Sequence, residues 1–288
     1  MLNLTHLKVL ASVARHGSVT EAAKELHYSQ SSVSHHLTRL EAATGAKLIQ
    51  RVGRGIRLTP EGRTLALRAT EIMGRVDAAA NELAAQVGLQ AGRVRLAANA
   101  SSLSTIAPQA AIALARSHPG IELVFVDRHP VEALQMLQHG EIDIALIFQH
   151  AGASLEEEAG FRFVHLCDDP IYLISRQPDD SMAHHRDSPW IGGCSRCRSE
   201  LDNVCRHAGF TPRFGSLSDD MVVVQALVAA GKGVTILPGL ALRAHRRPDI
   251  HATELTGFAR RIHAVTYGDP PDPPATLALI QALRDSVL

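Results

Sequence analysis

The chain has 288 residues and a hydrophobic content of 45%, enough for a sizeable core in two domains or in a small domain and a larger one. It carries 29 basic and 29 acidic residues, but the first 60 residues hold eight basic and three acidic ones, a net charge of +5 that leaves −5 on the remainder. A basic N-terminal segment on an acidic body favours a protein whose head binds a polyanion.

The chain opens without the charged and apolar regions of a signal peptide, and no apolar run is long enough to span a membrane. The longest candidate, residues 221–242, is interrupted by Gln225 and Lys232. Four cysteines without a signal peptide favour free thiols in a reducing compartment over a disulfide framework. We therefore expect a cytoplasmic protein.

Three helices are predicted in the head. Apolar residues at helical spacing over residues 4–14 predict a first helix that Gly17 ends. Residues 18–41 then predict two short helices with a tight turn at His27 and Tyr28. Ser18 begins the first of these with a capping-box spacing, Ser29 caps the second, and the second buries Val33, Leu37 and Leu40 on one stripe.

The opposite face of that last helix carries short hydrogen-bonding side chains and hardly any acid. A solvated helix face usually mixes glutamate and lysine, whereas a rigid row of donors and acceptors suits the base edges and phosphates of DNA. Two short strands at residues 47–50 and 56–59 follow as a β-wing with Arg57 beside it, where arginines reach phosphates or a minor groove. The predicted DNA contacts are Ser18, Ser29, Gln30, Ser31, Ser34, His35, Thr38, Arg39, Arg51 and Arg54.

A long helix is predicted next, because Thr59 is a good N-cap and Pro60 suits the first helical position. Its apolar seam has nearly heptad spacing over a length of about 40 Å; the seam consists of Leu65, Ala69, Ile72, Val76, Ala79 and Leu83. The simplest partner for it is the same helix of a second subunit, and the alternative is the chain's own C-terminal domain. Gly88 and Gly92 bracket the hinge that follows.

From residue 92 onward strands and helices alternate. The strands RVRLAAN, IELVFVD and IDIALIF are separated by helices at residues 105–117 and 131–139, which predicts a parallel sheet. A second set runs from FRFVHL through IYLIS to GVTILP, and RIHAVTYG with a helix at residues 275–287 returns to the first set. We therefore expect an α/β fold of two lobes with a ligand cleft, lobe I being residues 92–162 and 262–288 and lobe II residues 163–261.

The head motif SQSSVSHHLTRLE, followed by KLIQRVGRGIRLTPEG, resembles the LysR-type transcriptional regulators, as do HGEIDIALI and LVAAGKGVTILP. The resemblance implies a winged helix-turn-helix domain (residues 1–59), a linker and dimerisation helix (60–88) and a periplasmic-binding-protein-like (type 2) effector domain (92–288). It further implies a homodimer or homotetramer that binds operator DNA under the control of a small-molecule effector. Ile49 and Ser31 depart from the phenylalanine and proline that are common in the family.

The predicted effector site begins at Ser101 and Ser102, which follow the first strand of the effector domain. Their hydroxyls and the adjoining amides are suited to a carboxylate or another anion, although serine is also favoured in turns for purely local reasons. The family resemblance implies that Phe148, Gln149, Gly193 and Cys194 face the same loop.

The cysteines allow a second hypothesis. Cys194 and Cys197 form a CxxC at a predicted helix start, where a thiol pKa is lowered and a redox pair can form, so a thiol-based redox-sensing regulator or thiol oxidoreductase is the alternative function. Plain core or cleft-lining thiols are also compatible with the pattern. Zinc is disfavoured, because Cys197 and Cys205 would lie about 12 Å apart along one helix. Phosphate-loop and GxSxG motifs are missing, so we predict no catalytic residues, no cofactor and no metal.

Overall fold

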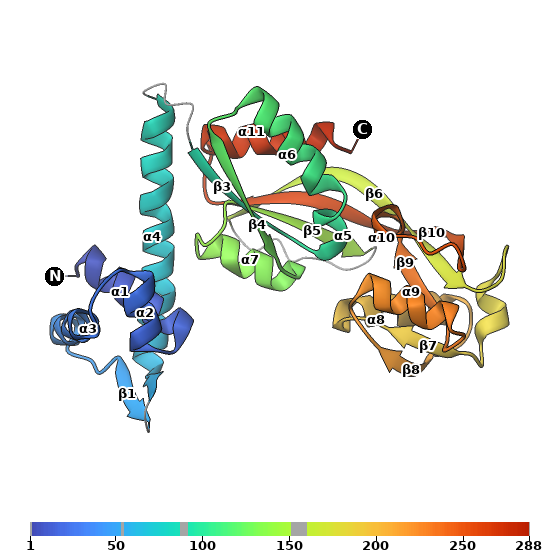
Figure 1. Ribbon diagram of the computed structural model, residues 1–288, viewed down its shortest axis with the longest axis horizontal. Coiled ribbons are helices and arrows are strands. Elements are labelled where there is room, and N and C mark those ends of the chain that lie inside the picture. Colours follow the sequence, from blue (N-terminus) through green and yellow to red (C-terminus); the bar gives the residue numbers. More distant parts are fainter. Residues whose placement is uncertain (1, 53–54, 87–91, 151–159, 288) are drawn as a thin grey trace.

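The computed structural model describes residues 2–52, 55–86, 92–150 and 160–287. Its N-terminal head contains three helices and a two-stranded antiparallel wing (Figure 1), which are α1 (Leu4–His16), α2 (Val19–Glu25), α3 (Gln30–Thr44), β1 (Ile49–Val52) and β2 (Gly55–Leu58). The predicted stripe Val33, Leu37 and Leu40 is fully buried against α1. The side chains of Ser18 and Ser29 cap α2 and α3, as the sequence predicts.

The wing is tied to the end of α3 by one carboxylate. Glu41 accepts hydrogen bonds from the backbone N–H of Leu48 at 2.9 Å and of Ile49 at 3.4 Å, and it pairs with Lys47 at 2.9 Å. These bonds, which together outweigh the cost of burying the carboxylate, lower the pKa of Glu41. The acid therefore fixes where the wing starts relative to α3.

The helix α4 (Pro60–Gln86) is 27 residues long and begins at the Thr59 cap, whose Oγ1 accepts from the Gly62 N–H at 2.9 Å. Its apolar seam divides into two halves. Leu65, Ala69 and Ile72 pack into the core of the head, whereas Val76 and Leu83 are 40% and 61% exposed. Only the second half of the predicted seam is thus available to a partner.

The same helix also touches the C-terminal part of its own chain, which was the alternative interpretation of the seam. A Cβ atom built on Gly74 would lie 2.5 Å from Cα of Gly140, which follows the helix α7 (Pro130–Gln138). Two backbones approach this closely only where neither residue has a side chain. Gly140 also has a φ of +69°, a conformation that favours glycine.

The C-terminal domain is built on one six-stranded sheet in the order β4-β3-β5-β10-β6-β9, with a small parallel pair β7-β8. The strands β4, β3 and β5 are parallel, and β10 runs antiparallel to β5 and β6. The strands are β3 (Gly92–Ala98), β4 (Ile121–Asp127), β5 (Ile144–His150), β6 (Phe161–Ser175), β7 (Pro189–Gly192), β8 (Arg213–Leu217), β9 (Thr235–Pro238) and β10 (His251–Tyr267).

Helices cover this framework in two groups (Figure 1). Those of lobe I are α5 (Ala100–Leu103), α6 (Ile106–Ser117), α7 and α11 (Pro274–Asp285); those of lobe II are α8 (Ser195–His207), α9 (Met221–Ala229) and α10 (Gly239–Ala244), after the short 3-10 helix Met182–His185. The long strands β6 and β10 run from one lobe into the other, so the chain crosses between the lobes twice. The predicted two-lobed α/β fold is confirmed.

Three details of the fold differ from the prediction. The strand predicted at RIHAVTYG is longer, since β10 begins at His251 and so includes Arg260. FRFVHL and IYLIS form one strand, β6, because Asp168, Asp169 and Pro170 between them stay in register with β10. The pairing of the two strands shifts beyond Pro170, where β10 has a bulge between Glu254 and Ala259. The short helices α5 and α10 were not predicted, since one turn of helix leaves almost no periodic signal.

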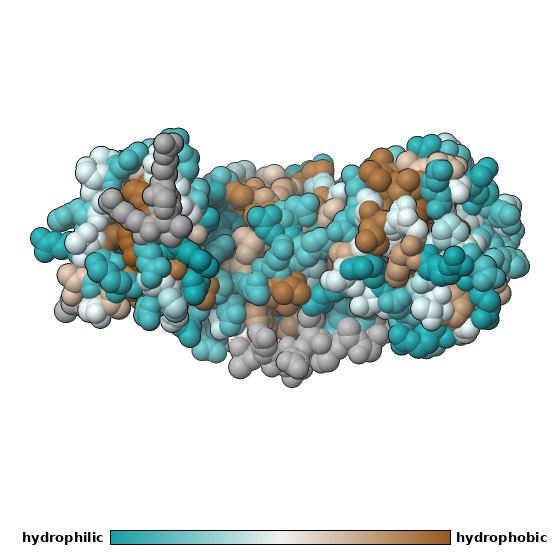
Figure 2. All heavy atoms as spheres, turned by 90° about the horizontal axis from the view of Figure 1, so that it is seen from below, coloured by the Kyte–Doolittle hydropathy of each residue, from teal (hydrophilic) through white to brown (hydrophobic). Residues whose placement is uncertain are grey.

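Apolar side chains also reach the surface. Figure 2, which views the molecule from below, shows apolar atoms at the end of lobe II where Figure 1 places β8 and α9. Four large apolar residues of these elements are exposed there, namely Phe214, Leu217, Val222 and Val223. In the part of the chain that the structure describes, no helix combines the length and the apolarity that crossing a membrane requires.

Candidate functional site

The outward face of α3 is open to solvent over its whole length. All six side chains predicted to read DNA from this helix are exposed, namely Gln30, Ser31, Ser34, His35, Thr38 and Arg39. The helix start is ordered by hydroxyls, since Ser29 Oγ lies 2.8 Å from Ser31 Oγ and accepts from the Ser32 N–H at 3.1 Å. A face without carboxylates at an ordered helix N-terminus is suited to a polyanion.

Aromatic rings support this face from behind, which the sequence pattern did not reveal. The half-buried His36 has its ring centre 5.2 Å from that of His6, 5.6 Å from that of Tyr28 and 6.2 Å from that of His35. Burial, together with His36 and Arg39 nearby, lowers the pKa of His6. The cluster packs α1 against α3, leaving the exposed His35 ring on its outer side.

The wing extends this surface. Gln50 pairs with Arg57 across the two strands, and Arg57 is exposed. Arg51 lies on β1 opposite Ile56. Its side chain, like the whole of Arg54, falls outside the residues described.

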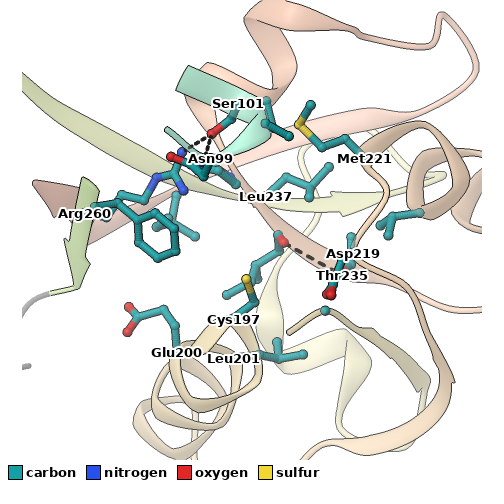
Figure 3. A pocket seen from close by; sticks show the side chains of 18 of the residues that line it. Asn99, Ser101, Cys197, Glu200, Leu201, Asp219, Met221, Thr235, Leu237 and Arg260 are labelled. Atoms are coloured by element: carbon teal, nitrogen blue, oxygen red, sulfur yellow. Dashed lines mark hydrogen bonds between the residues drawn. The ribbon is translucent and has the colours of Figure 1, made fainter. Parts of the chain in front are cut away.

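A cavity of about 130 Å³ opens between the two lobes. Lobe I contributes the segment after β3, with Asn99 and Ser101, and the end of β5, with Phe148 and His150. Lobe II contributes α8 and the segment before α9, and Figure 3 shows Cys197, Glu200 and Leu201 facing Ser101 and Arg260 across the space. The carboxyl ends of parallel strands meet there, which is where open α/β sheets bind small molecules.

One buried ion pair organises the lobe I side of this cavity. Arg260 Nε donates to Asp169 Oδ2 at 2.8 Å, and Arg260 Nη2 donates to Ser101 Oγ at 2.7 Å. Asp169 Oδ1 accepts from the Leu240 N–H at 2.8 Å, and the guanidinium lies 4.7 Å from the centre of the Phe148 ring. The arginine thus connects the strand crossing between the lobes to the Ser101 loop.

Both halves of the chain match known family profiles. Residues 88–287 match the profile described as LysR substrate binding domain, and residues 4–63 match that described as bacterial regulatory helix-turn-helix protein, lysR family. The chain belongs to the LysR family. It is a DNA-binding transcriptional regulator with a substrate-binding effector domain.

Relatives within the LysR family cover almost the whole chain. The HTH-type transcriptional regulator MetR of Salmonella typhimurium is 27% identical, with 99% of this chain and 90% of MetR covered. The uncharacterized HTH-type transcriptional regulator YfeR of Shigella flexneri is 27% identical, with 83% and 79% covered. Among solved structures, CbnR, a LysR family transcriptional regulator, has a TM-score of 0.71 at 22% identity with both chains fully covered. A full-length OxyR variant from Pseudomonas aeruginosa has a TM-score of 0.74 at 21% identity, with 100% and 95% covered.

The effector residues predicted for this LysR-family chain separate into two groups. Ser101, Phe148 and Gly193 line the cavity, whereas Ser102, Gln149 and Cys194 are not among its described lining residues. Ser102 is fully buried and its Oγ donates to Asn99 Oδ1 at 3.0 Å, so its hydroxyl holds the loop together. Lining residues that sequence reasoning missed include His129, His150, Glu200, Asp219 and Arg260.

The CxxC lies at the start of α8 as predicted, with Cys197 facing the cavity. Cys194 is the N-cap residue, and its Sγ lies 2.8 Å from Cys197 Sγ and 3.4 Å from the Cys197 N–H. The hydrogen bond from Cys197 lowers the pKa of Cys194 to about 6, although burial opposes the shift, and raises that of Cys197. Cys205 is buried, which raises its pKa. Over the described ranges, no three His, Cys, Asp or Glu residues are grouped to hold a metal ion.

Cys194 is expected to be the first thiol that iodoacetamide alkylates, because only the thiolate attacks. Its rate, followed by mass spectrometry of the peptide, should reach half its plateau near pH 6. In the Cys197→Ala variant the midpoint should move up by at least one pH unit, because the S–H donor is lost. A rate in the wild-type protein that is still rising at pH 9, as for an unperturbed thiol, would contradict the predicted thiolate.

Proposed function

We propose that this LysR-family regulator binds operator DNA through α3 and the wing, and that a small molecule in the interlobe cleft changes this binding. The observation that carries the proposal is that one chain combines an exposed, carboxylate-free face on α3 with a cavity lined by both lobes of the effector domain. A solved structure of CbnR, with a TM-score of 0.71 at 22% identity, contains its target DNA. Catalysis forms no part of the proposal.

In this proposal the residues have separate roles. Ser34, His35, Thr38 and Arg39 reach base edges in the major groove, since they lie along the exposed face of α3. The caps Ser18 and Ser29, with Gln30 and Ser31 in the first turn of α3, contact phosphates, because amides and hydroxyls at helix starts do so. Arg51 and Arg54 of the wing add phosphate or minor-groove contacts.

We further propose that the regulator acts as a dimer, or a dimer of dimers, in the cytoplasm, where its operator DNA lies. The exposed half of the α4 seam, Val76, Ala79 and Leu83, supports a paired helix, because an apolar stripe in water favours burial. The apolar patch of β8 and α9 offers a second contact. Two heads held in this way engage two half-sites of one operator.

A gel shift with DNA from upstream of the protein's own coding sequence tests the function. We expect a complex at nanomolar protein that an unrelated fragment of equal length does not compete away. The logarithm of the binding constant should fall linearly with that of the salt concentration, because bound phosphates release counterions. Equal affinity for both fragments would contradict the proposed operator recognition. The absence of a shift at low salt would contradict DNA binding altogether.

A further inference from the structure

The cavity between the lobes contains more negative charge than its arginine can balance. Arg260 is the only lysine or arginine among the described lining residues, and Asp169 already neutralises it through the 2.8 Å bond. Two further carboxylates, Glu200 of α8 and Asp219 before α9, face the space from lobe II. Figure 3 shows Glu200 below Arg260, on the helix that also carries Cys197 and Leu201, and Asp219 on the other side of the view.

Glu200 is an unusual acid because it is only 5% exposed. Its closest charged or titratable partner is His150, whose Nδ1 lies 3.5 Å from Glu200 Oε2. Burial raises the pKa of Glu200 because apolar surroundings disfavour its charged form, and a hydrogen bond with Asn203 only partly offsets this. A bound cation would supply the missing compensation.

His150, beside Glu200, has unsatisfied polar atoms. Neither of its ring nitrogens has a hydrogen-bond partner in the described structure, although both are buried. Burial, with Arg260 and Arg196 nearby, lowers the pKa of His150 to about 4, so its ring is neutral at neutral pH. A neutral imidazole keeps one nitrogen that accepts a hydrogen bond, and here that capacity is unused.

Of the two hydroxyls expected to bind an anion, only that of Ser101 lines the cavity, and only its O–H is left to donate. Ser101 Oγ accepts hydrogen bonds from Arg260 Nη2 and from Asn99 Nδ2, both at 2.7 Å. Ser102 donates to Asn99 and does not line the cavity. The anion site predicted from the two serines therefore has no free cationic group to support it.

The remaining walls are apolar and define the size of the guest. Side chains from both lobes make them up, including Ile171, Ile191, Leu201, Met221, Val224 and Leu237. The cavity of about 130 Å³ is close to engineered cavities of about 150 Å³ that hold benzene. A ligand body of about one ring fits this space.

We propose that the effector is a small organic cation, an apolar body of about one ring that carries a primary ammonium group held by Glu200 and His150. Asp219, from the segment before α9, provides a second carboxylate to the cavity. The proposal rests on the proposed function of the cleft as the effector site. A cationic effector differs from the ligand usually expected in an open α/β cleft, where helix N-termini and hydroxyl groups bind an anion.

Three probes with the same ring separate the possibilities: benzylamine (cation), benzyl alcohol (neutral) and benzoate (anion). Calorimetric titration of the full-length protein at pH 7 should give benzylamine at least about tenfold tighter binding than the other two, as expected for a charge-assisted hydrogen bond in a dry site. Equal or tighter binding of benzoate overturns the proposal. Absence of binding by all three at 10 mM also overturns it.

Glu200→Gln should abolish the preference for benzylamine while keeping the shape of the wall. Asp202→Asn, which removes the same charge from the same helix outside the cavity, should leave the preference intact. Asp219→Asn should weaken the binding of benzylamine less than Glu200→Gln does. If the Glu200 variant does not fold, the Asp219 variant still tests whether a carboxylate of the cavity binds the ammonium group. Benzylamine binding that Glu200→Gln leaves unchanged overturns the assigned contact.

The same preparation separates this proposal from the proposed function. A gel shift without ligand reports operator binding, and titration without DNA reports the ligand preference. Operator binding together with a preference for benzoate refutes the ligand class alone. A benzylamine preference in a protein that does not bind DNA refutes the regulator alone.

Discussion

Replacing Arg260 by methionine is expected to lower the free energy of unfolding of the effector domain by about 3–5 kcal/mol. The pair it belongs to is almost fully buried, with side-chain exposures of 5% for Arg260 and 2% for Asp169. Removing the arginine leaves the Asp169 carboxylate without its counter-charge in an apolar surrounding, which is far more costly than losing a surface pair. Urea unfolding followed by tryptophan fluorescence measures the change, because the single tryptophan, Trp190, is buried in lobe II.

Two companion variants sharpen this result. Arg247→Met breaks a pair with Asp249 whose side chains are 36% and 50% exposed, so it should leave the midpoint of urea unfolding almost unchanged. Asp169→Asn added to Arg260→Met removes the stranded charge, keeps an acceptor for the Leu240 N–H and should recover most of the loss. If the single Arg260 variant unfolds at the wild-type urea concentration, the ion pair does not stabilise the cleft.

Replacing Ser34 by aspartate is expected to weaken operator binding roughly 100-fold. Ser34 is exposed on α3, and its backbone carbonyl accepts from Thr38 Oγ1 at 3.0 Å, a bond that the new side chain does not remove. The helix should therefore stay folded while a carboxylate is placed in the major groove, where the DNA backbone repels it and its oxygens cannot donate to base edges. Fluorescence anisotropy with labelled upstream DNA measures the loss.

Ala43→Asp is the control variant: it places the same charge on the same helix. Ala43 is also exposed on α3, but nine residues on it lies half a turn around the helix from Ser34. It should change the affinity by less than about threefold, since only long-range repulsion acts on the DNA. Equal losses in both variants would mean that net charge, and not the outward face of α3, governs DNA binding.

The head could be predicted almost completely because its signals are local. Ser18, Ser29, Gly17 and Gly45 mark helix ends within a few residues, and the structure has them as caps. The 4-3 spacing of Val33, Leu37 and Leu40 gave their burial directly. The division of the α4 seam could not be predicted from the sequence. Whether the head or a second subunit covers Leu65 and Ile72 depends on how the head folds back onto the helix.

The cleft was only half predictable, because its important contacts are far apart along the chain. Arg260 and Ser101 are separated by 159 residues, and Arg260 and Asp169 by 91. No periodicity links such positions, so the sequence pattern did not single out Arg260. Ser101 and Ser102 were equivalent in sequence, and only the folded chain shows that Ser101 lines the cavity while the fully buried Ser102 holds the loop together.

The contact between Gly74 and Gly140 limits which residues positions 74 and 140 can hold. Ile72 packs on the head and Gly74 on lobe I, two positions about 3 Å apart along the helix axis. The head and lobe I therefore contact α4 at nearly the same level. A Cβ atom at position 74 would lie 2.5 Å from Cα of Gly140, so any side chain there forces α4 and lobe I apart. A substitution at either glycine would thus change the spacing between the head and the effector domain.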